Sequence, residues 1–335
     1  MQKTRFPAVI STFIVCYAFW ILLTWNFSAQ ELAAGAINFL KKTDDIFLYV
    51  FGHVSELKPL FSAYPEINGK YEIVDSEDAL TNYSDPMLAY TDENASLVKA
   101  MKYAKDGLSE GVVTLGATGA VLVCSIMILG KIKGLRPILA VELKAENDKP
   151  MLIVDCGANI DSRAELYVSF AKLGDAYMKC LGIANPRIAL LSNGAEKTKG
   201  NEAVKAAHKL LEATPVNFIG NVEATGALSG SQDVIVADGF SGNVLLKSIE
   251  GVAKTVIAEI EQKVQNSSEF KEILATVKKK YDYNTQGGAM LLGVNKPVMK
   301  GHGSATHEAI ENMLLRLSDL AKNGFIKKVR SSLEK

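Results

Sequence analysis

The sequence predicts an α/β protein built on a mostly parallel, doubly wound sheet. Short apolar runs typical of buried strands alternate with stretches of helical periodicity along most of the chain. Several of these runs end in a short loop rich in Gly and Asn, after which a helix pattern begins. The 335 residues are enough for one large α/β domain or two smaller ones.

The spacing of apolar residues defines each expected element in turn. Spacings of three and four predict helices over residues 28–40, 54–61, 95–106, 120–129, 164–181, 203–213 and 244–280. Apolar runs predict strands over residues 45–51, 71–74, 111–115, 138–143, 151–155, 187–191, 216–219, 233–237 and 289–293. The alternation favours a parallel sheet with crossover helices. The last and longest helical stretch, interrupted near 266–268, predicts a charged helical arm over about 244–283.

Four strand-to-helix loops carry the strongest functional signal. They lie at residues 156–159, 192–201, 220–223 and 238–243, and a fifth junction of the same kind lies at residues 116–119. Bare backbone N–H groups at helix N-termini attract anions, because the peptide dipoles favour negative charge there. On one parallel sheet these loops would line a single crevice at the strand C-termini. The sequence therefore predicts a protein that binds phosphate and does chemistry with it.

Composition excludes several classes of function. The chain carries 37 basic and 37 acidic residues, so a chain-wide basic surface for nucleic acid is not expected. The four cysteines show no CxxC spacing, and the four histidines show no zinc pattern, so no metal site is predicted. Most of the cysteines lie in or beside apolar runs, which predicts buried thiols in a reducing compartment.

The N-terminus carries a separate signal. Residues 8–25 contain no charge, follow Lys3 and Arg5, and end near Trp20 and Trp25. This length is close to the lower limit for a transmembrane helix, about 17–25 residues. Residues 1–27 are therefore predicted to be an apolar segment that contacts or anchors to a membrane, and the α/β domain is predicted over residues 28–335. The alternative is a long buried strand or helix beneath the domain.

Five motifs, taken in order and with their spacing, resemble the PlsX-type phosphate acyltransferases of bacterial phospholipid synthesis. They are DCGAN at 155–159, LLSNG…KGN at 190–201, NFIGNVE at 217–223, DVIVADGFSGNVLLK at 233–247, and GGA-x-LLG…KPV-x-K-x-HGS at 287–304. The resemblance runs from about residue 28 to about residue 320. It implies an αβα sandwich with an isocitrate dehydrogenase-like fold, and the transfer of an acyl chain from acyl carrier protein to inorganic phosphate, giving acyl phosphate.

The resemblance also implies partners and a location. It implies a homodimer in the cytoplasm, peripheral to the inner membrane, whose product passes to a glycerol-3-phosphate acyltransferase at the membrane. Phosphate is already an anionic nucleophile, so the protein needs to hold it beside a thioester carbonyl and stabilise the developing oxyanion. Neither a metal nor a cofactor is required for this task.

Candidate site residues follow from the matching motifs. The catalytic candidates are Asn221, Asp238, Lys247 and His302, and His302 is expected to protonate the leaving thiolate. The expected phosphate- or substrate-binding residues are Thr118, Gly157, Asn159, Lys199, Asn201, Glu223, Gly239, Ser241, Gly242, Asn243, Lys300 and Ser304. The alternative for most of these residues is a structural role, as a tight turn, a helix cap or a bond to backbone.

Three departures from the family pattern fall in the N-terminal half. The apolar residues 8–25 replace the usual first strand and its D-x-M-G-G-D loop, residues 91–96 are acidic where a basic stretch is usual, and Ala117 replaces an Asn. These departures leave two further functions open. One is a catalytically impaired relative that acts as a membrane-associated acyl- or carrier-binding module. The other is an enzyme that moves short acyl groups between coenzyme A and phosphate.

Overall fold

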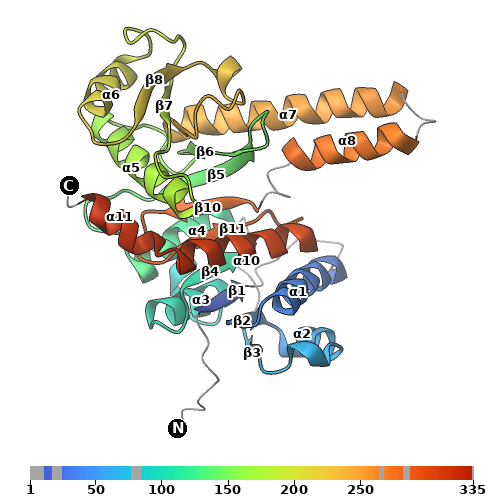
Figure 1. Ribbon diagram of the computed structural model, residues 1–335. Helices are drawn as coiled ribbons and strands as arrows, with labels where there is room; N and C mark the ends of the chain where they lie inside the picture. The colour runs from blue at the N-terminus through green and yellow to red at the C-terminus, as the bar shows by residue number, and fades with distance from the viewer. Residues whose placement is uncertain (1–10, 17–24, 77–84, 264–267, 282–286, 334–335) are drawn as a thin grey trace. The chain divides into compact units, whose positions relative to one another are not determined.

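The computed structural model describes residues 11–16, 25–76, 85–263, 268–281 and 287–333 (Figure 1). The chain divides into two compact units. Unit 1 comprises Met1–Lys131 and Val294–Ile326, and unit 2 comprises Ile132–Gly293 and Lys327–Lys335. Each unit contains hydrogen-bonded strands, most of them parallel, with helices packed on them. The predicted fold class is therefore confirmed.

The strands of unit 1 are all parallel, in the order β3-β2-β1-β4-β11. They are β1 (Ser11–Cys16), β2 (Ile46–Gly52), β3 (Tyr71–Asp75), β4 (Gly111–Thr114) and β11 (Val298–Lys300). The helices are α1 (Trp25–Lys42), α2 (Val54–Ser62), α3 (Ser96–Lys105), α4 (Thr118–Cys124), the π-helix Ser125–Leu129 and α10 (His307–Lys322), followed by α11 (Phe325–Leu333), which enters unit 2. Gly35 lets α1 approach α10 closely, because a Cβ there would lie 2.7 Å from the carbonyl oxygen of His307.

Strand β1 corrects one expectation about the N-terminus. It pairs in parallel with both β2 and β4, so the family's first strand is not missing and no sheet edge is left open there. For Ser11–Cys16 the strand alternative was the right one, whereas residues 8–10 and 17–24 lie outside the described part of the chain. Within the described residues, no helix is long and apolar enough to cross a bilayer.

The strands of unit 2 follow the order β10-β5-β6-β9-β7-β8. They are β10 (Ala289–Leu292), β5 (Ile138–Lys144), β6 (Pro150–Val154), β9 (Val234–Val236), β7 (Ile188–Leu191) and β8 (Phe218–Val222). Strand β5 is antiparallel to both neighbours, and the pairs from β6 to β8 are parallel. The helices are α5 (Ala164–Cys180), α6 (Glu202–Glu212), α7 (Gly239–Lys263) and α8 (Ser268–Tyr281).

Helices α7 and α8 pack side by side as the predicted arm (Figure 1). Helix α7 begins at Gly239, five residues before the predicted start, so the Gly- and Ser-rich motif forms its first turn rather than a loop. Two glycines there make close packing possible. A Cβ on Gly242 would lie 2.0 Å from the carbonyl oxygen of Asp155, and one on Gly239 would lie 2.8 Å from that of Asn159.

Strand β8 also differs from the sequence prediction. It was expected to end at residue 219, but it continues through Gly220 and Asn221 to Val222. Gly220 adopts φ +102°, and the pairing with β7 shifts register between Ile188 and Ala189, so the strand passes through an irregularity rather than stopping. Only a single 3₁₀ turn, Ala224–Gly226, follows it, and the expected helix start is absent between β8 and β9.

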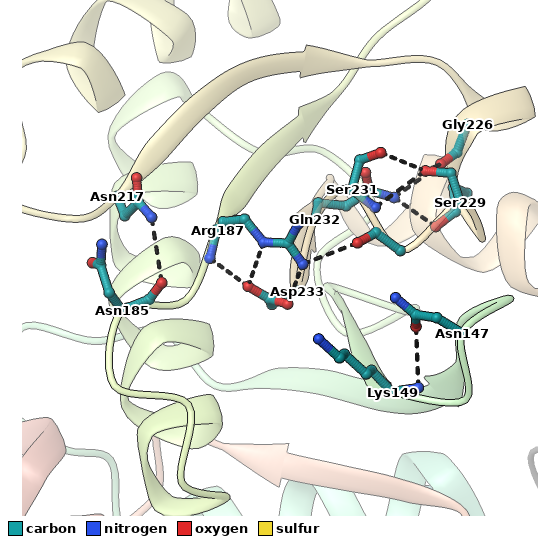
Figure 2. A network of polar contacts seen from close by, with 12 residues as sticks. Asn147, Lys149, Asn185, Arg187, Asn217, Gly226, Ser229, Ser231, Gln232 and Asp233 are labelled. Carbon is teal, nitrogen blue, oxygen red and sulfur yellow. Dashed lines mark hydrogen bonds and ion pairs between the residues drawn. The ribbon is translucent and has the colours of Figure 1, made fainter.

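A charged clamp joins the starts of β7 and β9 (Figure 2). The Arg187 guanidinium donates to both carboxylate oxygens of Asp233, from Nε at 3.0 Å and from Nη2 at 2.7 Å, and Nη2 also donates to Gly230 O at 2.9 Å. Burial opposes ionisation of Asp233, but the bonds from Arg187 outweigh it and hold the pKa of this carboxyl below its ordinary value.

The approach of α7 to the loop after β6 predicts a contrast between two glycines of the same helix. Gly242→Ala should lower the free energy of unfolding by about 1–3 kcal/mol or more, because the new methyl group overlaps Asp155 O. Gly251→Ala should instead raise it by about 0.5–1 kcal/mol, because no atom lies within 4 Å of the added Cβ. Urea denaturation measures the free energy of unfolding of both variants. Equal changes in the two would contradict the close contact between Gly242 and the loop after β6.

The clamp predicts a pH-dependent contribution to stability. Because its pKa is lower in the folded state, Asp233 stabilises the fold above its unfolded pKa of about 3.9, and this stability is lost as the pH falls through the folded pKa. Asp233→Asn should cost about 1–3 kcal/mol at pH 7 and flatten the acid limb of stability against pH. Glu93→Gln, which removes an exposed ion pair with Lys102, should change neither the stability at pH 7 nor the acid limb. An unchanged acid limb in Asp233→Asn would refute the role of the clamp.

Candidate active site

A cleft of about 1210 Å³ opens in unit 2 where α5, α6 and α7 begin. Three parallel strands, β6, β9 and β7, precede these helices and are neighbours in the sheet, so their carboxyl ends meet at one edge. The cleft is lined by Arg136, by residues 160–163 and 165–167 around the start of α5, by Asn201 and Ala203 at the start of α6, and by Asp238, Phe240 and Ser241 at the start of α7. Three of the four predicted loops therefore lead into helices that begin around one crevice.

Asp238 caps α7. Its carboxylate accepts hydrogen bonds from Ser241 N at 2.7 Å, from Ser241 Oγ at 2.9 Å and from the Tyr167 hydroxyl at 3.2 Å. Burial, and next the neighbouring Asp238 carboxylate, raise the pKa of Tyr167 well above its ordinary value, so the phenol stays protonated as a donor. The carboxylate thus occupies the helix N-terminus that was expected to form the main anion site.

The loop after β6 is organised around the buried Asp155. This carboxylate accepts from Leu139 N at 2.9 Å, from Ala158 N at 3.2 Å and from Asn159 N at 2.7 Å. The Asn159 amide donates to Asp155 at 2.8 Å and to Pro137 O at 2.9 Å, so both of its hydrogens are used inside the protein. Burial raises the pKa of Asp155, and the bonds that it accepts oppose this rise. Gly157, at φ +120°, makes the turn of this loop.

The loop between β7 and α6 has a similar internal frame. Asn201 caps α6 through a bond from Val204 N at 2.9 Å, and Asn193 Oδ1 accepts from Gly200 N at 2.8 Å. A Cβ at Gly194 would lie 2.6 Å from Lys199 Cγ, so the exposed Lys199 lies across this loop. Asn201 lines the cleft, whereas Lys199 does not.

Two further candidates, Asn221 and Glu223, lie at the end of β8. Asn221 bonds His208 Nδ1 through Oδ1 at 2.8 Å and donates from Nδ2 to Glu196 O at 2.9 Å. Glu223 is exposed and precedes the 3₁₀ turn without capping it through its side chain. Neither Asn221 nor Glu223 lines the cleft.

Further along α7, Lys247 is not among the residues that line the cleft. Its Nζ lies 2.8 Å from Glu250 Oε2, and this carboxylate is buried with a side-chain exposure of 8%. Asn243 is exposed in the first part of the same helix. The structure thus brings Asn201, Asp238 and Ser241 together at the cleft and leaves Lys247 and Asn243 outside its lining.

The remaining candidates belong to unit 1. Strand β11 pairs with β4, with Lys300 opposite Thr114, and Gly301 N donates to Thr114 O at 2.9 Å, so the two following loops are neighbours. Thr118 begins α4 after the first loop. In the second loop His302 Nδ1 accepts from Ser304 N at 3.2 Å and lies 2.7 Å from Ser304 Oγ. A neutral ring that accepts at Nδ1 carries its proton on Nε2 and presents it as a hydrogen-bond donor.

The sequence analysis missed several groups at the cleft. Arg136, Ser162, Arg163 and Tyr167 all line it, and Asp155 holds the adjoining loop. The available signal was the Asp-Ser-Arg run just before the predicted helix at 164–181, which places a polar and a cationic residue at a helix start. Arg136 lies before β5 and is brought to the cleft only by the tertiary structure.

Comparison with known proteins gives a consistent result. A family model described as "Fatty acid synthesis protein" matches residues 24–328. A phosphate acyltransferase of Clostridium perfringens is 36% identical over 92% of this chain and 94% of its own length, and one of Dictyoglomus turgidum is 36% identical over 92% and 95%. A phosphotransacetylase of Streptococcus pyogenes shares the fold, with a TM-score of 0.58 at 19% identity over 93% of this chain and 94% of its own. This chain is therefore a member of the fatty acid synthesis protein family, the PlsX family of phosphate acyltransferases.

Proposed function

We propose that the protein transfers an acyl chain from acyl carrier protein to inorganic phosphate, giving acyl phosphate for phospholipid synthesis. The cleft at which three helices begin, with Arg136 and Arg163 in its lining, carries this proposal for the chain itself. The names of the relatives support the reaction class.

The chemistry needs only groups that the chain supplies. A phosphate oxygen attacks the thioester carbonyl carbon, a C–O bond forms, and the C–S bond then breaks as the tetrahedral intermediate collapses. The proton of the attacking hydrogenphosphate ends on the departing thiolate, and the Nε2–H of His302 donates a hydrogen bond to the sulfur as it leaves, because Ser304 N donates to Nδ1. Positioning of the two substrates and stabilisation of the oxyanion account for most of the rate enhancement.

The proposed assembly and location are supported by the surface of the arm. Exposed apolar side chains lie on both helices of the arm, Val252 and Val256 on α7 and Phe270 and Ile273 on α8. Such a surface supports a homodimer peripheral to the inner membrane face, which would hand its labile product to a glycerol-3-phosphate acyltransferase there.

A second function is supported by one feature of unit 1. Ala117, which replaces an Asn of the family pattern, sits at the N-cap of α4 and gives no side-chain cap. A relative that lacks this donor and binds acyl carrier protein without turnover remains the competing proposal. Formation of acyl phosphate by purified protein, measured as hydroxylamine-trapped product, separates the two, because a rate equal to that of buffer excludes the enzyme.

The proposed role of His302 predicts a specific loss of turnover. His302→Ala should lower kcat by about 10²–10³-fold, because the leaving thiolate loses its hydrogen-bond donor, while the thermal midpoint stays near that of the wild type. Ser304→Ala should lose less, since its backbone N–H still reaches Nδ1. Added imidazole should restore part of the activity of His302→Ala. Wild-type kcat in that variant would remove His302 from the mechanism.

A further inference from the structure

The cleft of unit 2 is larger than one inorganic ion needs. Its volume of about 1210 Å³ exceeds the range of about 300–1000 Å³ that is typical of sites for drug-sized ligands. Two exposed apolar side chains, Ile160 at 66% and Phe240 at 63% exposure, also line it. The size and the mixed lining favour a long ligand that has polar and apolar parts.

The donors at the start of α5 form a built site for phosphoryl oxygens. Ser162 is only 9% exposed, yet its Oγ has no hydrogen-bond partner in the described part of the chain, and it lines the cleft. Arg163, the N-cap residue of α5, gives no side-chain hydrogen bond to the helix, so the first N–H groups of α5 are left without a side-chain cap. Among the described residues, the guanidinium groups of Arg136 and Arg163 form no ion pair or hydrogen bond.

The charge of the lining selects between anions. The lining contains two guanidinium groups, those of Arg136 and Arg163, and three carboxylates, those of Asp161, Glu165 and Asp238. Such a balance disfavours a free dianion, because each carboxylate repels it, and tolerates a single negative charge held at the arginines and the α5 N-terminus. Asp161, Glu165 and the side-chain oxygen of Asn201 are hydrogen-bond acceptors, which suit a ligand that also carries amide N–H groups.

We propose that this cleft binds the phosphopantetheine arm of the acyl donor, with its phosphodiester held by Ser162, Arg163 and Arg136. The inference rests on the proposed function and deepens it, because it assigns the cleft to the thioester substrate rather than to inorganic phosphate. The phosphodiester carries one negative charge, the amides of the arm meet the acceptors, and its methyl and methylene groups lie against Ile160 and Phe240.

Steady-state kinetics with two acyl donors tests this assignment. Arg163→Ala, Arg136→Ala and Ser162→Ala should raise KM for acyl carrier protein thioester, about tenfold or more for the arginine variants, and leave KM for phosphate within about twofold. With an acyl-pantetheine thioester that lacks the phosphate group, the wild type and the variants should have equal KM values. Arg316→Ala, an arginine of α10 in unit 1, is the matched control and should behave as the wild type.

The outcomes separate this inference from the function on which it rests. A rise in KM for phosphate alone, or no change in either KM, overturns the assignment of the cleft while the enzyme stands. If the wild type makes no acyl phosphate from either donor, the proposed function fails. Calorimetric titration with holo acyl carrier protein, which carries the arm as a phosphodiester, then still tests the cleft, and equal affinity of the wild type and Arg163→Ala overturns it.

Discussion

The contact between the first turn of α7 and the loop after β6 determines the shape of the candidate site. Gly239 and Gly242 have no room for a side chain, because the backbone of that loop lies against them. The loop keeps its path because the buried Asp155 carboxylate accepts hydrogen bonds from three backbone N–H groups and from the Asn159 amide. Without this pairing, α5 and α7 would not begin beside the same cleft.

Much of the fold could be predicted because its signals are local. Apolar periodicity placed most helices and strands, and the Gly/Asn loops located the three helix starts around the cleft. The continuation of β8 through Gly220 was missed because a glycine at positive φ is more often a turn than a strand irregularity. Strand β1 was missed because its apolar run also has the length and character of a membrane segment.

The site was predicted less completely, for a physical reason. The polar residues of the motifs bind their own backbone, as Asp238 does at α7, Asn201 at α6 and Asn159 beside Asp155. Motif residues of this kind hold the loops of the site in place, whereas the groups left for a ligand, such as Ser162 and Arg136, lie outside the motifs. The spacing of Gly and Asn therefore predicts where these loops lie. The side chains that line the cleft between them are known only from the tertiary structure.

Helix α7 begins beside the cleft and continues as one half of the arm. Its 25 residues correspond to a rod of about 37 Å. A rod of this length acts as a lever, because a tilt of a few degrees at the distal end must be accommodated where Phe240 and Asp238 meet the cleft. A partner that binds the arm and displaces the far end of α7 would therefore change the geometry of the cleft.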